Sequence, residues 1–277
     1  MKRDYLETLI LLAKRRGFKT HFYIDRLSVY FDARVSNDDL MQLKNCSPKN
    51  KLISPSTLEG YIHLSQKLEL YQLDDDTLDL LKECCESNSA YKITYIELAM
   101  DFSNTSKLKV DTLRSFFNKH LVKIRKKSPK PPYFIDINDA HYYNDLSDSI
   151  RLVIYSDKPF RFNRKRFCVH LECRYKGLDA LKTLEILIAK DVVDFDHQMY
   201  WEQRLDLRKP SFKAMGEYLG NTDVSDNALN KRGCKFFDKL HSLQELLSKS
   251  PEQIKLFPSM ATDEALEKFL DRAFEKP

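Results

Sequence analysis

The stretch that decides the fold is residues 166–176, RFCVHLECRYK. Side chains there alternate between two faces, which is typical of a β-strand with one buried face. The apolar face holds Phe167, Val169, Leu171, Cys173 and Tyr175, and the polar face holds Arg166, Cys168, His170, Glu172 and Arg174. The pattern predicts a strand that ends at Gly177, in a sheet with one face against a core.

The same alternation recurs outward along the chain. We expect strands at residues 21–32, 61–71, 92–102, 133–137 and 149–156, and helices at 3–16, 37–43, 74–85, 110–122 and 178–190. Residues 45–58 contain two prolines and are expected to form a loop. Beyond residue 195 the periodicity is helical almost throughout, at 196–207, 211–219, 226–248, 251–256 and 262–274. The order predicts an α+β fold with a mostly antiparallel sheet and helices on one face. Residues 1–190 would form the main domain and 191–277 a helical C-terminal region.

Composition excludes several classes of protein. The six glycines form no GxGxxG and no GxxxxGK[ST], which argues against a dinucleotide-binding fold and against a P-loop. The six cysteines include no CxxC pair, so we expect reduced thiols rather than a structural zinc site. No apolar run is long enough to span a bilayer, and the N-terminus lacks a signal-peptide core. These features predict a cytoplasmic protein without a membrane partner.

Polar residues from separate strands would share one surface if these strands are neighbours. Glu97 and Asp101 lie on one face of 92–102, and Tyr155 shares a face with Arg151 in 149–156. Together with His170 and Glu172 they would form a set of oxygen and nitrogen donors suited to Mg²⁺ or Mn²⁺. Such an ion polarises phosphoryl oxygens, and a nearby phenol could attack phosphorus. The plainer alternative is a wetted sheet face with cross-strand ion pairs.

Tyr155 is the preferred nucleophile among the 14 tyrosines. Tyr200 is the main rival, because it lies on an expected helix with Arg204 one turn away. Tyr175 is the third candidate, although its parity places it on the apolar face.

Basic loops flank the expected site strands. The net charge is only +5, from 46 Lys+Arg against 41 Asp+Glu, but the positive charge is clustered. One cluster comprises Lys123, Arg125, Lys126, Lys127 and Lys130, and the other comprises Lys158, Arg161, Arg164, Lys165 and Arg166. Phe160, Phe162 and Phe167 interleave with the second cluster. Cations between aromatic rings suit a phosphate backbone and unstacked bases, although a solvated charged loop is the common alternative.

Four segments, in order, resemble the motifs of the rolling-circle replication initiation factors of plasmids and filamentous phages and of related relaxases. They are IDRLSV at 24–29, KITYIELAMD at 92–101, RLVIYSDK at 151–158 and VHLECR at 169–174, and the resemblance spans about residues 22–190. His170 with Glu172 is similar to a variant of the HUH metal motif. The chain departs from the family pattern at Tyr95, Glu97 and Ser156.

The resemblance implies an HUH/Rep-nickase-like domain that initiates rolling-circle DNA replication. It would nick an origin hairpin or single strand with Mg²⁺ or Mn²⁺ and form a 5′-phosphotyrosine on Tyr155. Glu97, Asp101, His170 and Glu172 would hold the metal, while Arg151, Lys158, Arg164, Lys165 and Arg166 would contact DNA. A host helicase is the expected partner of the C-terminal region. The alternatives are a non-catalytic origin-binding or regulatory protein and a metal nuclease that uses water.

Overall fold

The structure is a computed structural model of the 277-residue chain. It describes residues 5–32, 36–53, 64–87, 91–120, 135–137, 140–142 and 149–205, together with 266–268, 270, 271 and 274.

The described chain alternates strands and helices, as the sequence predicts. The strands are β1 (Lys19–Asp32), β2 (Lys51–Ile53), β3 (Leu64–Tyr71), β4 (Tyr91–Asn104), β5 (Ile135–Ile137), β6 (Ala140–Tyr142), β7 (Ile150–Tyr155) and β8 (Phe167–Lys176). The helices are α1 (Tyr5–Arg15), α2 (Asn37–Asn45), α3 (Asp75–Ser87), α4 (Lys107–His120), α5 (Leu178–Lys182), α6 (Ala189–Val193) and α7 (His197–Arg204). The described helices include none that is long and apolar enough to cross a membrane.

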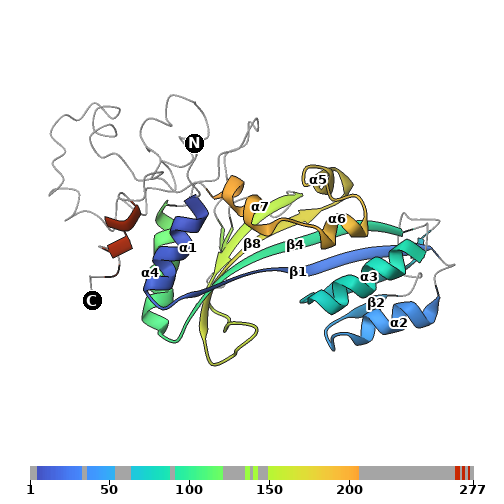
Figure 1. Ribbon diagram of the computed structural model, residues 1–277, viewed down its shortest axis with the longest axis horizontal. Helices are drawn as coiled ribbons and strands as arrows, with labels where there is room; N and C mark the ends of the chain where they lie inside the picture. The colour runs from blue at the N-terminus through green and yellow to red at the C-terminus, as the bar shows by residue number, and fades with distance from the viewer. Residues whose placement is uncertain are drawn as a thin grey trace.

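The strands form one eight-stranded sheet in the order β2-β3-β1-β4-β8-β7-β6-β5. Neighbouring strands pair antiparallel. The long strands β1, β4 and β8 lie side by side at its centre (Figure 1). The α+β class with an antiparallel sheet is therefore confirmed.

One face of the sheet is buried under the helices. Leu98, Met100 and Leu171 are fully buried there and belong to the same core as Leu9 of α1 and Phe117 of α4. Trp201 of α7 belongs to this core too, as do Leu266 and Leu270. Burial of this continuous apolar face fixes which alternate residues of each strand point to the helices. The remaining residues of each strand form the polar surface on the other face.

The strand β1 contains an extra residue at Asp25. Ile24 pairs with Leu98 and Arg26 pairs with Glu97, so Asp25 is bulged out of the ladder with β4. Ile24 and Leu27 are both buried in the core, which leaves Asp25 and Arg26 together on the polar side. A β-bulge shifts side-chain alternation in this way and often re-aims a side chain at a functional site.

Two expectations differ from the structure. The single helix expected at 178–190 is two short helices, α5 and α6, separated by a turn in which Glu185 has a positive φ of 59°. Asp191 accepts the backbone N–H groups of Leu187 and Ile188, which starts α6 independently. The expected loop at 45–58 contains the short strand β2.

Part of the expected organisation lies outside the described residues. That part includes the basic cluster 123–130 and the helices expected at 211–219, 226–248 and 251–256. The division of the chain at residue 190 stays a prediction.

Candidate active site

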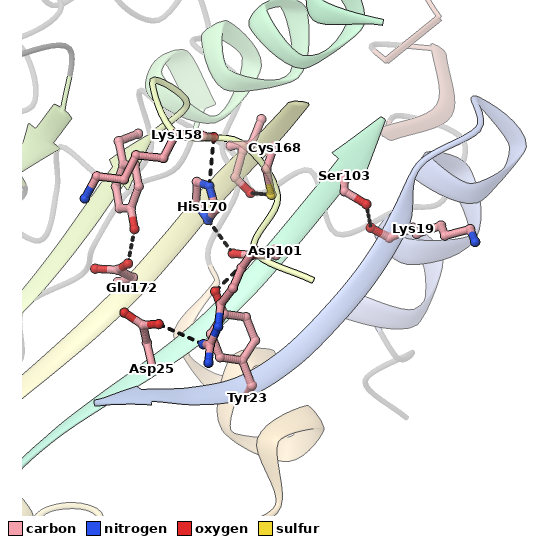
Figure 2. A network of polar contacts seen from close by, with 12 residues as sticks. Lys19, Tyr23, Asp25, Asp101, Ser103, Lys158, Cys168, His170 and Glu172 are labelled. Carbon is pink, nitrogen blue, oxygen red and sulfur yellow. Dashed lines mark hydrogen bonds and ion pairs between the residues drawn. The ribbon is translucent and has the colours of Figure 1, made fainter. Parts of the chain in front are cut away.

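The predicted site residues meet on the polar face of the central strands. Asp101 of β4 pairs in register with His170 of β8, and His170 pairs with Tyr155 of β7. Glu172 lies two residues from His170 and therefore on the same face. Figure 2 shows the side chains of Asp101, His170 and Glu172 on the same side of the sheet. The prediction that the polar faces of the three strands align is confirmed.

His170 is held between two acceptors. Its Nδ1 lies 2.9 Å from Asp101 Oδ1, and its Nε2 lies 3.2 Å from the Lys158 carbonyl oxygen. Burial alone would lower the pKa of His170, but the hydrogen bond to Asp101 and its charge raise that pKa above the usual value. Because each ring nitrogen faces an acceptor, the doubly protonated imidazolium is favoured. Tyr23 of β1 donates its hydroxyl to the other Asp101 oxygen at 2.9 Å, so this fully buried carboxylate is satisfied on both sides.

Tyr155 donates a hydrogen bond to Glu172. Its ring stacks on the His170 ring, with centroids 4.6 Å apart and planes 19° apart. Burial, followed by the charge of Glu172, raises the pKa of Tyr155 above its usual value, so the phenol is protonated at neutral pH. The Glu172 carboxylate already contacts the hydroxyl, which is the geometry that a general base needs to remove a proton from this phenol.

Arg174 neutralises two acids at the far end of the network. Its Nη2 donates to Glu172 Oε2 at 2.7 Å, and its Nε lies 3.3 Å from Glu97 Oε1. Glu97 also accepts a hydrogen bond from Tyr95. Burial, and then the charge of Glu172, raise the pKa of Glu97 to about 7. The single positive charge of Arg174 is shared by two buried carboxylates, so the pair keeps a surplus of negative charge.

Asp25 is a site residue that the sequence analysis missed. It lines the same cleft as Tyr155 and pairs with Arg161, whose Nη1 lies 2.9 Å from Asp25 Oδ1. Burial, then the charge of Glu172, raise the pKa of Asp25. By strict alternation Asp25 would share the apolar face of Leu27, and the bulge that overrides this has no local signal in the sequence. The family-like segment IDRLSV, which contains Asp25, was the available pointer.

An open cleft of about 760 Å³ gives access to these groups. Tyr23, Asp25, Tyr155 and His170 form its acidic and aromatic wall. Its cationic lining consists of Lys49, Lys158, Arg161 and Arg164. A cleft lined by cations beside Tyr155 suits a phosphodiester, because the cations can neutralise its phosphate while the phenol lies within the same cleft.

The four predicted metal ligands do not form one tight group of donor atoms. Within the described residues, the group whose donor atoms all lie within 4.8 Å of one another is Asp101, Cys168 and His170. Glu97 and Glu172 lie on the same face but are held by Arg174. Cys168 shares that face, as its parity predicts, but it was not expected as a donor. Burial raises the pKa of its thiol, and so favours the protonated form.

The two rival tyrosines lie away from the cleft. Tyr175 and Tyr200 are buried in the core on the helix side, and their hydroxyl oxygens are 2.8 Å apart. Neither lines the cleft, whereas Tyr155 does.

The predicted DNA-binding cations are divided. Lys158 and Arg164 line the cleft, and Lys158 Nζ lies 5.2 Å from the Tyr155 ring centroid. Lys165 is exposed beside them. Arg166 instead donates to Ser103, through Nε at 3.2 Å and Nη2 at 2.9 Å. Arg151 lies further along the polar face, in register with Arg174.

No protein-family model and no curated protein matches the chain. Among solved structures, the chain is similar to a rolling circle replication initiator protein from Geobacillus stearothermophilus, with 9% sequence identity and a TM-score of 0.44. The match covers 70% of this chain and 89% of that one.

Proposed function

We propose that this protein initiates rolling-circle DNA replication by nicking a DNA single strand at an origin, with Tyr155 as the nucleophile. The observation that carries the proposal is the hydrogen bond from the Tyr155 hydroxyl to Glu172, at the base of a cleft lined by cations. A tyrosine in contact with its own base, in a cleft open to a phosphate, is the arrangement needed for covalent phosphoryl transfer. The motif order described above supports the same activity.

In the proposed reaction, Glu172 accepts the proton of Tyr155 as the phenol oxygen bonds to phosphorus. The bond between phosphorus and the 3′ oxygen breaks, and that oxygen takes up a proton from solvent in the open cleft. The products are a free 3′-hydroxyl and a 5′-phosphotyrosine on the protein. Lys158 and Arg164 would neutralise the phosphate oxygens as charge builds on them. His170 would hold the Tyr155 ring by stacking, with Asp101 fixing the imidazole.

The acids on the polar face of the sheet fit a hard divalent cation by their donor chemistry. Asp25, Asp101 and Glu172 offer carboxylate oxygens, and the raised pKa values of Asp25 and Glu97 reflect negative charge that burial leaves poorly compensated. We propose that Mg²⁺ or Mn²⁺ is held by Asp101 and Glu172, with Asp25 as an additional ligand and Glu97 and His170 beside them. A bound ion would supply a Lewis acid for the phosphoryl oxygens.

The pairing of Arg174 with both Glu97 and Glu172 favours a second candidate, a DNA-binding protein that does not cleave. In that case the acids serve as partners of a structural cation, and Tyr155 as a packed ring with a satisfied hydroxyl.

A covalent-adduct assay separates the candidates. Single-stranded oligonucleotides with a randomised central segment and a 3′ label are incubated with the full chain and Mn²⁺, then resolved on a denaturing protein gel. The nickase gives a labelled band at the position of the protein, which Tyr155→Phe abolishes while DNA binding persists. Tyr175→Phe and Tyr200→Phe are matched controls, because each removes a buried hydroxyl without touching the cleft, and both should retain the band.

Cleavage without a labelled protein indicates a nuclease that uses water, and binding without cleavage indicates the second candidate. An adduct that survives in Tyr155→Phe overturns the assignment of the nucleophile.

A further inference from the structure

The connection between β7 and β8 is a compact hairpin that overhangs the cleft, here called the 158–167 hairpin. Its neck is closed by a bridge between Pro159 and Phe167 and by a hydrogen bond from Phe160 N to Arg166 O at 2.8 Å. At its tip, Arg166 N donates to Asn163 O at 2.9 Å. The hydrogen bonds from Arg166 to Ser103 tie the hairpin to β4. The hairpin is therefore a braced structure rather than a loose loop.

The two phenylalanines near the tip have opposite environments. Phe160 is buried, and its ring centroid lies 4.6 Å from that of His21. Phe162 leaves 57% of its surface exposed. Its ring is nevertheless held in place, with centroids 5.9 Å from His21 at a 29° interplanar angle and 5.4 Å from Tyr23 at 85°. A large apolar ring that is both exposed and fixed is ready to receive another flat ring at little cost in entropy.

Arg161 connects this ring to the acidic wall. Its guanidinium lies 5.0 Å from the Phe162 centroid and 4.7 Å from the Tyr23 centroid, while it pairs with Asp25. The side chain that holds Phe162 thus reaches into the cleft that contains Tyr155. A group stacked on Phe162 would therefore lie beside the reacting phosphodiester.

The charges around Phe162 suit a nucleic acid strand. Lys158 and Arg164 line the cleft, and the exposed Lys165 follows them on the hairpin. Phosphates repeat along a strand between successive bases, so cations that alternate with an aromatic ring match its backbone and its bases at once. A single exposed ring set among cations is too small an apolar surface for a protein interface, and the other exposed ring of the hairpin, Phe167, lies at its neck.

We propose that the 158–167 hairpin holds a binding site for one unstacked nucleobase, with Phe162 as the stacking surface. The proposal deepens the proposed function, since it assigns the base next to the cleaved phosphate to this site. The interaction is independent of base identity, because every base has a π-face.

Fluorescence anisotropy with two oligonucleotides tests the proposal, in a Tyr155→Phe background so that no cleavage occurs. One probe is oligothymidylate and the other is the same length with abasic positions throughout. Phe162→Ala should weaken binding of oligothymidylate roughly 5- to 150-fold. It should leave the abasic probe unaffected and the salt dependence unchanged, since no phosphate contact is lost. Phe167→Ala is the matched control, because Phe167 is also exposed, at 40%, but lies at the neck of the hairpin. It should bind like the parent.

A second variant keeps the test independent of folding. Phe162→Trp retains a flat ring, so it should bind oligothymidylate as the parent does, and its emission should be quenched by stacking. The natural tryptophan, Trp201, is fully buried and gives a constant background.

Equal binding of oligothymidylate by Phe162→Ala and its parent overturns the proposal, and so does an equal loss on the abasic probe. Nicking is judged separately by the covalent adduct. If the parent chain forms no adduct but its binding of oligothymidylate depends on Phe162, the nucleobase site stands and the nickase function is overturned. A chain that binds neither probe overturns both.

Discussion

Glu97→Gln should make the stability of the protein less dependent on pH. Glu97 is 7% exposed and carries a pKa raised from 4.5 to about 7 by burial and by Glu172. A carboxyl with a raised pKa binds its proton more tightly in the folded state, so stability falls as the pH rises from about 4.5 through about 7. The shift corresponds to about 3 kcal/mol, at about 1.4 kcal/mol for each pKa unit. Glutamine resembles the protonated acid and removes this loss.

Urea denaturation of metal-free protein at pH 5 and pH 8, followed by the emission of Trp201, measures the effect. Between these two pH values the parent should lose up to about 3 kcal/mol more unfolding free energy than Glu97→Gln does. The comparison cancels the packing effect of the substitution, and it cancels Asp25 and His170, which titrate in both proteins. Tyr95→Phe is a control that removes the hydroxyl partner of Glu97 and keeps the carboxyl, so it should retain the pH dependence. Parallel pH profiles for the parent and Glu97→Gln would refute the charge surplus that underlies the metal proposal.

Three further outcomes are expected. In a thermal unfolding assay without DNA, Mn²⁺ at a hundred times its dissociation constant should stabilise the parent by about 2.7 kcal/mol and should stabilise Glu172→Gln much less. Equal shifts for the two proteins would place the ion elsewhere. Arg174→Gln strands two buried carboxylates and should cost about 3–5 kcal/mol in chemical denaturation, with part of the loss recovered on adding Mn²⁺; a loss below about 1 kcal/mol would show that the pairing contributes little. Leu27→Ala should cost about 2–5 kcal/mol at a fully buried position, whereas Leu108→Ala, at 68% exposure, should stay within about 0.5 kcal/mol, and similar losses would contradict the core assignment.

The strand faces could be predicted from the sequence because the side-chain period of a strand is fixed by its backbone. Asp101, His170 and Tyr155 were placed on one surface from parity alone, and the register of β4, β8 and β7 brings them together. Parity gives the face but not the distance along it. The sequence could not show that Arg174 would form ion pairs with both Glu97 and Glu172.

The position of Asp25 in the site and the division of the helix at 178–190 could not be predicted, and the reason is the same for both. Both depend on a local departure from a regular period, and tertiary packing decides such departures. In β1 the core needs Ile24 and Leu27 on the same side, which the chain achieves by bulging Asp25. Between Leu178 and Lys190 the apolar pattern suits one helix, but the positive φ of Glu185 and the cap by Asp191 divide it.

The position of the site in mid-strand makes its geometry a consequence of the core. Asp101, His170 and Tyr155 lie on the reverse side of strands whose other parity is sealed beneath the helices. A slip of one residue in the register of β8 would turn His170 and Glu172 into the core and expose Leu171. The large free energy of burying such apolar side chains therefore holds the register in which His170 meets Asp101 and Tyr155. Glu97 and Asp25 can then keep their raised pKa values because the core, rather than their own contacts, holds them in place.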